Sequence, residues 1–145
     1  MTTYTTEFSC VLQLKSADQV TAAQTIYAEF DSKKENEGET VGFDLHGDPA
    51  DPGAQLSITD SDGEGNPDNV VLFVERCAEA FGLSGLWGFQ WSYGCSAPRL
   101  DGFGGGAVIY DLARRQEVER IDSFDWLAQR LAAHTAATVR EIAPV

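Results

Sequence analysis

The chain has 145 residues, of which 43% are hydrophobic and 10% aromatic, enough for one packed core without disulfides or metals. We therefore expect a single domain spanning residues 1–145. The formal net charge of −13 argues against direct binding to nucleic acids and to anionic membranes, because the phosphates of both would repel it.

Two further features bear on the cellular location. No apolar run approaches the ~20 residues of a membrane span, and the polar, threonine-rich start does not have the pattern of a secretory signal. The three cysteines are widely spaced and form no C-x-x-C pair, which favours reduced thiols over a zinc ribbon or a redox motif. Together these features predict a cytoplasmic protein without a membrane segment.

The first predicted strand runs from about Thr5 to Lys15, where apolar residues alternate with mostly polar ones. Ser16 then has the properties of a helix N-cap, and Gln19 is placed to complete a capping box. The apolar residues that follow recur at helical spacing. We expect this helix to end before the charged segment 31–39, which has the composition of a solvated loop.

Two short strands are predicted next. Val41, Phe43 and Leu45 share one face of the first strand, and Leu56 and Ile58 mark the second. The segment between them, HGDPADPG, is rich in turn-forming residues. The pair is therefore predicted to form a hairpin with a long loop.

The clearest helix in the sequence follows residue 66. Asn66 suits an N-cap, and Pro67 suits the first helical position because its ring fixes a helical φ. A broad apolar stripe from Val70 to Phe81 predicts that one side of the helix is buried. Gly82 is a typical residue for the C-terminal cap.

A strand with an aromatic face is predicted over residues 86–93. The side chains on that face are Trp87, Phe89, Trp91 and Tyr93. A stacking platform for nucleic-acid bases would need neighbouring basic residues, and this region offers Arg99 alone. Burial beneath the helices is the simpler explanation, and a protein-binding face is the alternative.

The remaining predicted elements are two strands and a helix. The strands are expected over residues 107–112 and about 118–121, after a glycine-rich loop. Ser123 is a suitable N-cap for the last helix. Its apolar side chains are expected to face the core, namely Phe124, Leu127 and Leu131.

The order of these elements indicates an α+β fold. Strand, helix, strand, strand, helix, strand is the order of a ferredoxin-like (βαββαβ) domain, in which two helices cover one face of an antiparallel sheet. The C-terminal hairpin and helix would extend that sheet. Because this fold hosts many functions, the fold alone assigns none of them.

The negative charge is concentrated in residues 29–68. That segment contains twelve acids and two lysines, which accounts for ten of the thirteen net negative charges. Acids alternate at 35, 37 and 39 and again at 60, 62 and 64, so an extended backbone would place carboxylates about 6.6 Å apart on one side. Such a surface attracts basic partners. The simpler interpretation is that acidic loops keep the protein soluble.

A weak calcium-loop pattern lies in the same segment. Asp60, Asp62, Glu64 and Asp68 occupy its positions one, three, five and nine, with Gly65 at the sixth. Position twelve is a valine where a bidentate glutamate is needed, and the preceding element is a predicted strand. We therefore expect an exposed turn whose acids favour the N-terminus of the next helix, with a calcium site as the less favoured alternative.

A second candidate site is the glycine-rich segment GFGGGA. Backbone N–H groups of such segments bind anions in other settings, and the candidate residues are Arg99, Gly104 and Gly105. Phosphate-binding loops lead into a helix, however, and this segment leads into a predicted strand. A flexible hairpin connection is the preferred interpretation.

The sequence contains no visible catalytic constellation. Neither His46 nor His134 belongs to a recognisable triad or metal-binding motif, so a non-enzymatic protein without a cofactor is favoured. We hypothesise that the acids bind a basic protein surface, for example as a nucleic-acid mimic that occludes the site of a nucleic-acid-binding protein. The residues predicted to do so are Glu35, Glu37, Glu39, Asp44, Asp48, Asp51, Asp60, Asp62 and Glu64.

Two alternative functions stay open. One is a small-ligand-binding or metal-dependent protein, or an enzyme, that uses a pocket near Arg99 and the glycine-rich segment. The other is a structural or assembly subunit that self-associates through an exposed aromatic face.

Overall fold

The computed structural model describes residues 2–99 and 102–142, with side chains described up to residue 137. Within this range the fold is α+β, with two antiparallel sheets and three helices. None of these described helices has both the length and the apolar character needed to cross a membrane. The elements in chain order are β1 (Tyr4–Glu7), β2 (Ser9–Gln13), α1 (Ala17–Asn36), β3 (Phe43–His46), β4 (Gln55–Asp60), α2 (Pro67–Phe81), β5 (Leu86–Cys95), β6 (Gly104–Asp111), β7 (Gln116–Asp122) and α3 (Ser123–Ile142).

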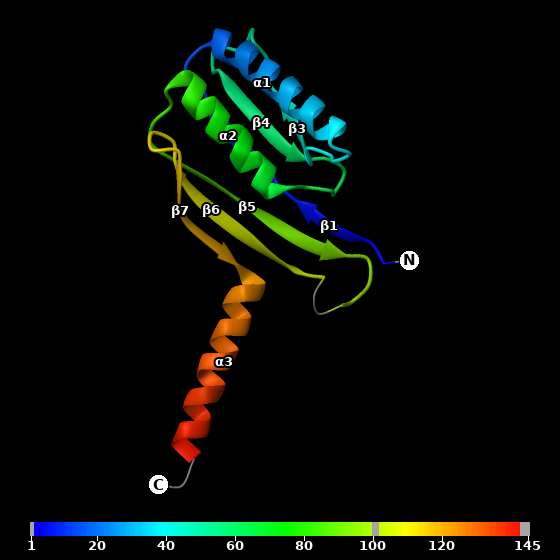
Figure 1. The fold of residues 1–145 in the computed structure, drawn as a ribbon, viewed down its shortest axis with the longest axis vertical. Helices are drawn as coiled ribbons and strands as arrows, with labels where there is room; N and C mark the ends of the chain where they lie inside the picture. Colours follow the sequence, from blue (N-terminus) through cyan, green and yellow to red (C-terminus); the bar gives the residue numbers. More distant parts are fainter. Residues whose placement is uncertain (1, 100–101, 143–145) are drawn as a thin grey trace.

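The first predicted strand divides at Phe8 and contributes to both sheets. β1 pairs with β5 in a four-stranded sheet of order β1-β5-β6-β7, and β2 pairs with β4 in a three-stranded sheet of order β2-β4-β3. Figure 1 shows the two sheets one above the other, with β1 leading from one to the other. The single ferredoxin-like sheet is therefore not confirmed, because its strands form two sheets.

The division at Phe8 has a local cause. The Asp60 carboxylate accepts hydrogen bonds from the N–H of Phe8 at 2.9 Å and from the N–H of Gly63 at 2.8 Å, which holds the chain at the crossing point. The Phe8 ring is buried edge-on against Phe89, with ring centroids 5.7 Å apart. A crossing strand of this kind lets both sheets share one core.

Helices α1 and α2 lie side by side over the three-stranded sheet (Figure 1). The caps predicted at three positions are confirmed, since the Ser16 side chain accepts from the N–H of Gln19, the Asn66 side chain accepts from the N–H of Asn69, and Gly82 ends α2 with φ of 60°. The cap predicted at Ser123 is wrong, because the carboxylate of the preceding Asp122 accepts from the first N–H groups of α3. The end predicted for α1 is wrong, because the helix continues to Asn36.

Two interactions explain the longer helix α1. Lys33 and Lys34 lie in its last turn, where positive charge complements the helix dipole. Phe30 is buried, and the guanidinium of Arg76 lies 4.6 Å from its ring centroid. The charged segment 31–39 therefore continues a helix that is already anchored, and its first six residues are helical.

The core lies between the helices and the two sheets. It includes Phe43, Phe73 and Ile58, all fully buried, and three side chains of the aromatic strand. The preferred burial of that strand is confirmed, since Trp87, Phe89 and Trp91 are all buried and Tyr93 is half-buried. The alternative of a protein-binding face is therefore wrong for Trp87, Phe89 and Trp91.

Helix α3 extends away from both sheets (Figure 1). It follows β7 directly, and its Phe124 ring stacks on Tyr93 with centroids 5.7 Å apart. Beyond this first turn the helix leaves the core, and Leu127 and Leu131 are 51% and 59% exposed. The expectation that these two leucines face inward is wrong, because the helix begins at the far end of β7 and continues away from it.

Candidate functional site

The end of α1, the start of β3 and the end of β4 lie at the same end of the molecule (Figure 1), and acidic residues are frequent in and around these segments. The turn after α1 folds back on the helix, because the N–H of Glu39 donates to the Lys34 carbonyl at 2.9 Å. The loop after β4 is joined to β3, because Ser61 Oγ donates to Asp44 Oδ1 at 3.1 Å. We call this cluster the acidic end and define it as Asp31, Glu35, Glu37, Glu39, Asp44, Asp62 and Glu64.

Tyr27 reports the negative potential at the acidic end. Its hydroxyl donates to the Phe43 carbonyl at 2.7 Å. The pKa of Tyr27 is raised to about 12, first by burial and then by the negative charges of Asp31 and Asp44. These two carboxylates come from α1 and β3, and both act on the same hydroxyl.

Positive charge is sparse around the acidic end. The Lys34 ammonium lies 3.3 Å from the Glu39 carboxylate, and Lys33 is exposed to solvent. Arg76 from α2 also lies near the end of α1, with its guanidinium 4.6 Å from the Phe30 ring centroid, so three cations stand against the seven carboxylates of the cluster. The surface therefore keeps a net negative charge that attracts basic partners at a distance.

Six of the nine predicted partner-binding residues lie in the acidic end. Asp48 and Asp51 do not, because they lie in the loop at the other end of β3 and β4. Their carboxylates stabilise turns there, accepting from the N–H groups of Ala50 and Gly53, each at 2.9 Å. The carboxylate of Asp60 is also occupied, since it holds the backbone at the crossing of the two sheets.

The regular alternation of carboxylates expected from the sequence is not formed. Glu35 belongs to α1, so its side chain follows helical and not extended spacing. Asp62 has φ of 49° in a tight turn, closed by the N–H of Glu64 donating to the Ser61 carbonyl at 2.8 Å. The acidic end is therefore a cluster built from several elements and not a linear ladder.

The four acids of the calcium pattern are not brought together. Asp60 binds backbone N–H groups, and Asp68 forms an ion pair with Arg120 at 2.8 Å. Among the residues that the structure describes, no group of three or more His, Cys, Asp or Glu side chains is placed to hold a metal ion. The turn at Asp62 and Glu64 leads into the N-cap of α2.

The glycine-rich segment is a loop only at Gly102 and Phe103, because β6 begins at Gly104. The N–H of Gly105 donates to Ser123 Oγ at 2.9 Å, so it is already used within the protein. A Cβ atom at Gly106 would lie 2.4 Å from Cζ2 of Trp91, which shows that the indole rests directly on this strand. Gly104 pairs with Tyr93, and Arg99 is exposed in the connection before β6. Gly106 thus makes room for the Trp91 ring.

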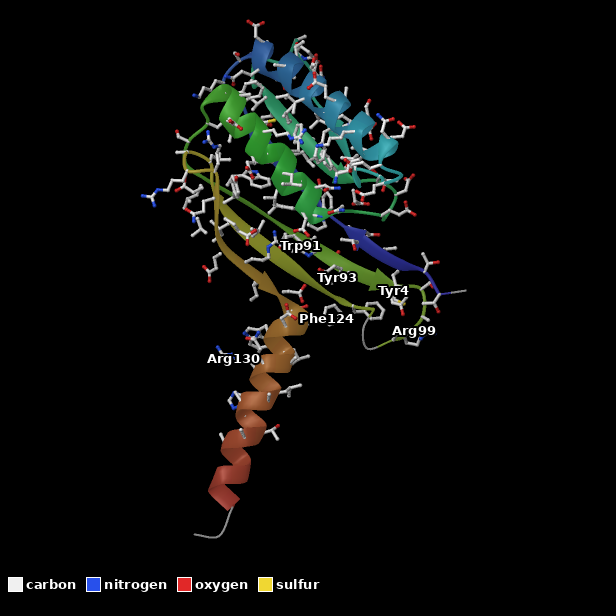
Figure 2. The ribbon with its side chains drawn as sticks, viewed as in Figure 1. Tyr4, Trp91, Tyr93, Arg99, Phe124 and Arg130 are labelled. Carbon is white, nitrogen blue, oxygen red and sulfur yellow. The ribbon has the colours of Figure 1, made fainter. Side chains whose placement is uncertain are left out.

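A network of aromatic and charged side chains links the sheet to α3 (Figure 2). Trp91 Nε1 donates to the Tyr93 hydroxyl at 3.0 Å, and that hydroxyl donates to Asp122 Oδ2 at 3.1 Å. Arg120 lies 5.6 Å from the Trp91 ring and holds Asp68 at 2.8 Å. Burial is the first of several causes that raise the pKa of Tyr93. The network fixes the point at which α3 leaves the sheet.

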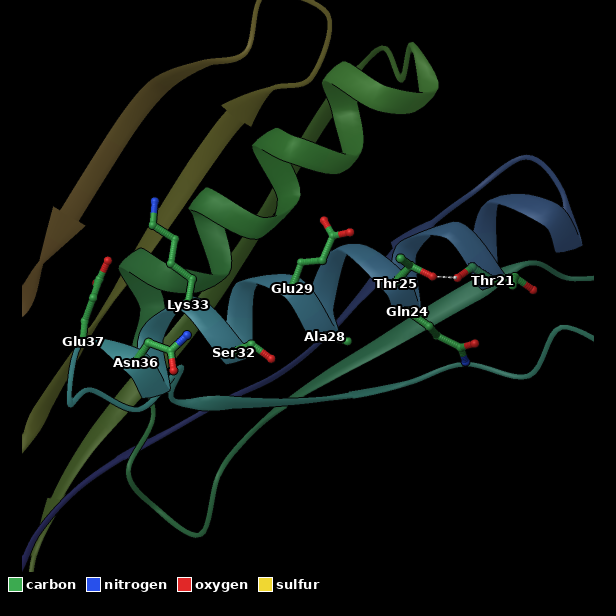
Figure 3. A pocket seen from close by; sticks show the side chains of 9 residues that line it. All are labelled: Thr21, Gln24, Thr25, Ala28, Glu29, Ser32, Lys33, Asn36 and Glu37. Atoms are coloured by element: carbon green, nitrogen blue, oxygen red, sulfur yellow. Dashed lines mark hydrogen bonds between the residues drawn. The ribbon is translucent and has the colours of Figure 1, made fainter.

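A groove of about 810 Å³ runs along the outer face of α1 (Figure 3). Side chains of one helix and of the residue that follows it supply the whole lining, so the groove has no opposing wall to enclose a ligand. Its lining residues are Thr21, Gln24, Thr25, Ala28, Glu29, Ser32, Lys33, Asn36 and Glu37.

A second hollow, of about 260 Å³, lies beside Tyr93, between β1 and the start of α3. This volume falls below the ~300–1,000 Å³ of typical small-molecule sites. Gly104, Gly105 and Gly106 help to line a larger hollow of about 410 Å³ on the other side of the start of α3, and Arg99 lines neither hollow. The alternative of a small-ligand site near Arg99 and the glycine-rich segment therefore stays a prediction from the sequence. The lining residues are Tyr4, Thr5, Thr6, Tyr93, Gly94, Gly102 and Phe124.

Sequence reasoning missed Asp31 and the Tyr93–Asp122 link. The charged composition of segment 31–39 predicts a loop at Asp31. The helix continues there because Arg76 contacts Phe30, and this contact joins parts of the chain that are distant in sequence. Tyr93 and Asp122 are 29 positions apart, and no local spacing rule relates them.

Comparison with known proteins finds no matching family model, no matching curated protein and no matching solved structure.

Proposed function

We propose that this chain is a non-enzymatic binding protein whose acidic end engages a basic surface of a partner protein. The concrete form of the proposal is an inhibitor that covers a nucleic-acid-binding site by presenting carboxylates where phosphates would bind. Its support is the gathering of carboxylates from α1, β3 and two loops, with two lysines among them. Opposite charges steer association and select among partners.

The acidic end is held in place by backbone hydrogen bonds. The N–H of Asn66 donates to the Gly42 carbonyl at 3.1 Å, and the N–H of Thr6 donates to the Gly63 carbonyl at 2.8 Å. These bonds connect the loops on either side of β3 and β4 to α2 and β1. A surface fixed in this way loses less conformational entropy on binding than a flexible acidic tail does, which favours a specific partner.

The proposal is tested by capturing proteins from a cell lysate on the immobilised chain at ~50 mM and ~500 mM salt. We expect a basic nucleic-acid-binding protein to be retained at the lower salt, released at the higher salt and displaced by duplex DNA added as a competitor. Release by salt follows from screening of the charges, and displacement by DNA follows from occupation of the same site.

The matched variants carry the same change in net charge at two places. E35K together with E37K reverses charge within the acidic end, and D18K together with E79K reverses two exposed acids outside it. We expect the first pair to lower affinity for the captured protein at least tenfold, and the second pair to lower it less than threefold. Equal losses from both pairs, or retention that DNA does not displace, would contradict the proposal.

We also propose that the two sheets derive from a single βαββαβ arrangement. When β1 and β2 are taken as one strand, β4 lies between the two strands that α1 connects, and the joined strand lies between the two that α2 connects. This interleaving is the split βαβ pattern. It supports a ferredoxin-like ancestry for the fold, with the break at Phe8 and the additional strands β6 and β7 as departures.

A further inference from the structure

Helix α3 carries a row of large side chains that the structure leaves exposed. Trp126, Leu127 and Leu131 are 50%, 51% and 59% exposed, and with Arg130 they lie along one side of the helix. Helices in proteins gain most of their stability by burying an apolar face against other elements. We call these four residues the helix stripe, and it lacks a covering surface among the described residues.

The four-stranded sheet carries a second exposed apolar surface. Strand alternation places Leu86, Ile109 and Ile121 on the face opposite to Trp87 and the buried core. These three side chains are 71%, 42% and 51% exposed. Glu119 pairs with Ile109 across β6 and β7, so an acid lies beside them. We call Leu86, Ile109, Ile121 and Glu119 the sheet patch.

The two surfaces meet in a concave corner where α3 leaves the sheet. Gln90, Ala107 and Ile121 from the sheet and Trp126 from α3 line a hollow of about 410 Å³ there. The hollow is large enough to receive several side chains from another molecule. It joins the helix stripe and the sheet patch into one continuous surface.

The geometry of the junction prevents α3 from covering the sheet patch of its own chain. Asp122 Oδ1 accepts from the N–H groups of Phe124 at 2.9 Å and Asp125 at 3.3 Å, while Oδ2 accepts from the Tyr93 hydroxyl. Phe124 is also stacked on Tyr93, on the core side of the sheet. Because no loop separates β7 from α3, the helix cannot turn back without breaking these contacts.

We propose that a second copy of this chain covers both surfaces, with the α3 helix of each protomer lying across the sheet patch of the other. One protomer offers one helix stripe and one sheet patch, so a two-fold pair satisfies both and closes on itself. Each of the six large apolar side chains is roughly half exposed and offers on the order of 100 Å². Two copies therefore bury about 1,200 Å², within the range of specific interfaces.

Charge complementarity supports a second copy as the occupant. The helix stripe carries Arg130, and the sheet patch carries Glu119. Two chains of net charge −13 repel each other in general, so reciprocal contacts between opposite charges define which faces meet. The acidic end lies on α1 and the three-stranded sheet, outside both surfaces. Pairing is therefore independent of the proposed partner binding.

The first test is the mass of the full chain by sedimentation equilibrium between ~1 and ~100 µM. We expect a dimer that dissociates on dilution. L131E in the helix stripe and I109K in the sheet patch are each expected to weaken the dimer at least tenfold. A132E, on the opposite side of α3, is the matched control and leaves the dimer unchanged. Far-ultraviolet circular dichroism and the thermal midpoint establish that each variant is folded.

A charge exchange then identifies the surfaces that meet. R130E and E119R each place like charges together in both halves of the dimer, so each alone is expected to be monomeric at concentrations where the unaltered chain pairs. Mixing the two variants restores opposite charges at both contacts, and we expect a mixed dimer. A chain that is monomeric at ~100 µM overturns the proposal. A dimer that is insensitive to L131E and I109K, or an assembly that grows beyond two copies, also overturns it.

Discussion

The contact of Trp91 with Gly106 shows how single residues set the close approach of β5 and β6. The indole ring lies where a side chain at 106 would begin, and its Nε1 donates to Tyr93. The same indole lies beneath the guanidinium of Arg120. One glycine therefore makes room for a side chain that packs, donates a hydrogen bond and receives a cation.

Replacing Gly106 with alanine is expected to destabilise the protein by about 1–3 kcal/mol, the usual cost of overpacking a core. The new Cβ would lie 2.4 Å from Trp91 Cζ2, closer than atoms can approach, so the ring or the strand must move. The measurement is the free energy of unfolding in urea. G53A is the control, because a Cβ on that exposed turn would come no closer than 3.2 Å to its nearest neighbour, a carboxylate oxygen of Asp51, and we expect a change within about 0.5 kcal/mol. Equal effects would rule out this role for Gly106.

At the scale of elements, the crossing of one strand between two sheets depends on Asp60. Its carboxylate holds the N–H groups of Phe8 and Gly63, and Trp87 Nε1 reaches across the gap to the Val11 carbonyl at 3.0 Å. These bonds replace the cross-strand pairing that is interrupted at the crossing. The two sheets are therefore joined by a small number of specific hydrogen bonds as well as by the core.

We expect D60A to destabilise the protein by about 1–3 kcal/mol, because it removes one acceptor that serves two backbone donors. Protection of the Phe8 amide from hydrogen exchange should fall together with the free energy of unfolding. E64A is the control, since that carboxylate is exposed in the same loop, and we expect no more than about 0.5 kcal/mol. An unchanged exchange rate at Phe8 in D60A would show that the carboxylate does not hold the crossing.

Local patterns predicted the element types and three of the helix caps, and long-range contacts decided most of the rest. Ser16, Asn66 and Gly82 act as caps because capping depends on neighbouring backbone groups, which a sequence shows directly. The break at Phe8 was not predicted, because it depends on Asp60, 52 positions away. The direction of α3 was missed for a similar reason, since its apolar spacing is the same whether its cover comes from its own core or from another chain.

The candidate site was predictable in composition and not in shape. The acidic segment was visible from residue counts, and six of its nine predicted residues gather at one end. Asp48, Asp51 and Asp60 are diverted into turns and backbone contacts. A short acid beside glycine or proline suits a turn as well as a binding surface, so its role depends on the fold around it.

At the scale of the whole molecule, two cysteine thiols and a tyrosine hydroxyl that burial keeps protonated make the stability of the fold sensitive to high pH. Burial raises the pKa of the Cys77 thiol, and of the Cys10 thiol, from an ordinary value near 9 to about 12. Tyr110 is raised to a pKa of about 12, first by burial and then by Glu75. In each case the folded chain keeps a proton that the unfolded chain has already lost.

The stability of the protein is therefore expected to be complete below about pH 9 and to fall as pH rises from about 9 to about 12. Each group held neutral in this window contributes up to about 1.4 kcal/mol per pH unit to the slope. Urea unfolding between pH 7 and pH 11 measures that slope. C77A removes one of these protons and should therefore lower the slope by up to about 1.4 kcal/mol per pH unit. Stability that stays level to pH 11 would contradict the expectation.

Because β7 joins α3 directly, the sheet fixes the direction of the helix and the side on which each of its residues lies, while the length of the helix is not fixed in this way. The last strand sets the angular phase of every side chain that follows, because no flexible residue intervenes. One residue inserted between β7 and α3 would rotate all later side chains by about 100° around the helix axis, so Leu127 and Leu131 would face a different direction. Residues added or removed at the far terminus leave that phase untouched. Helix α3 can therefore become longer or shorter while its direction stays fixed by the sheet.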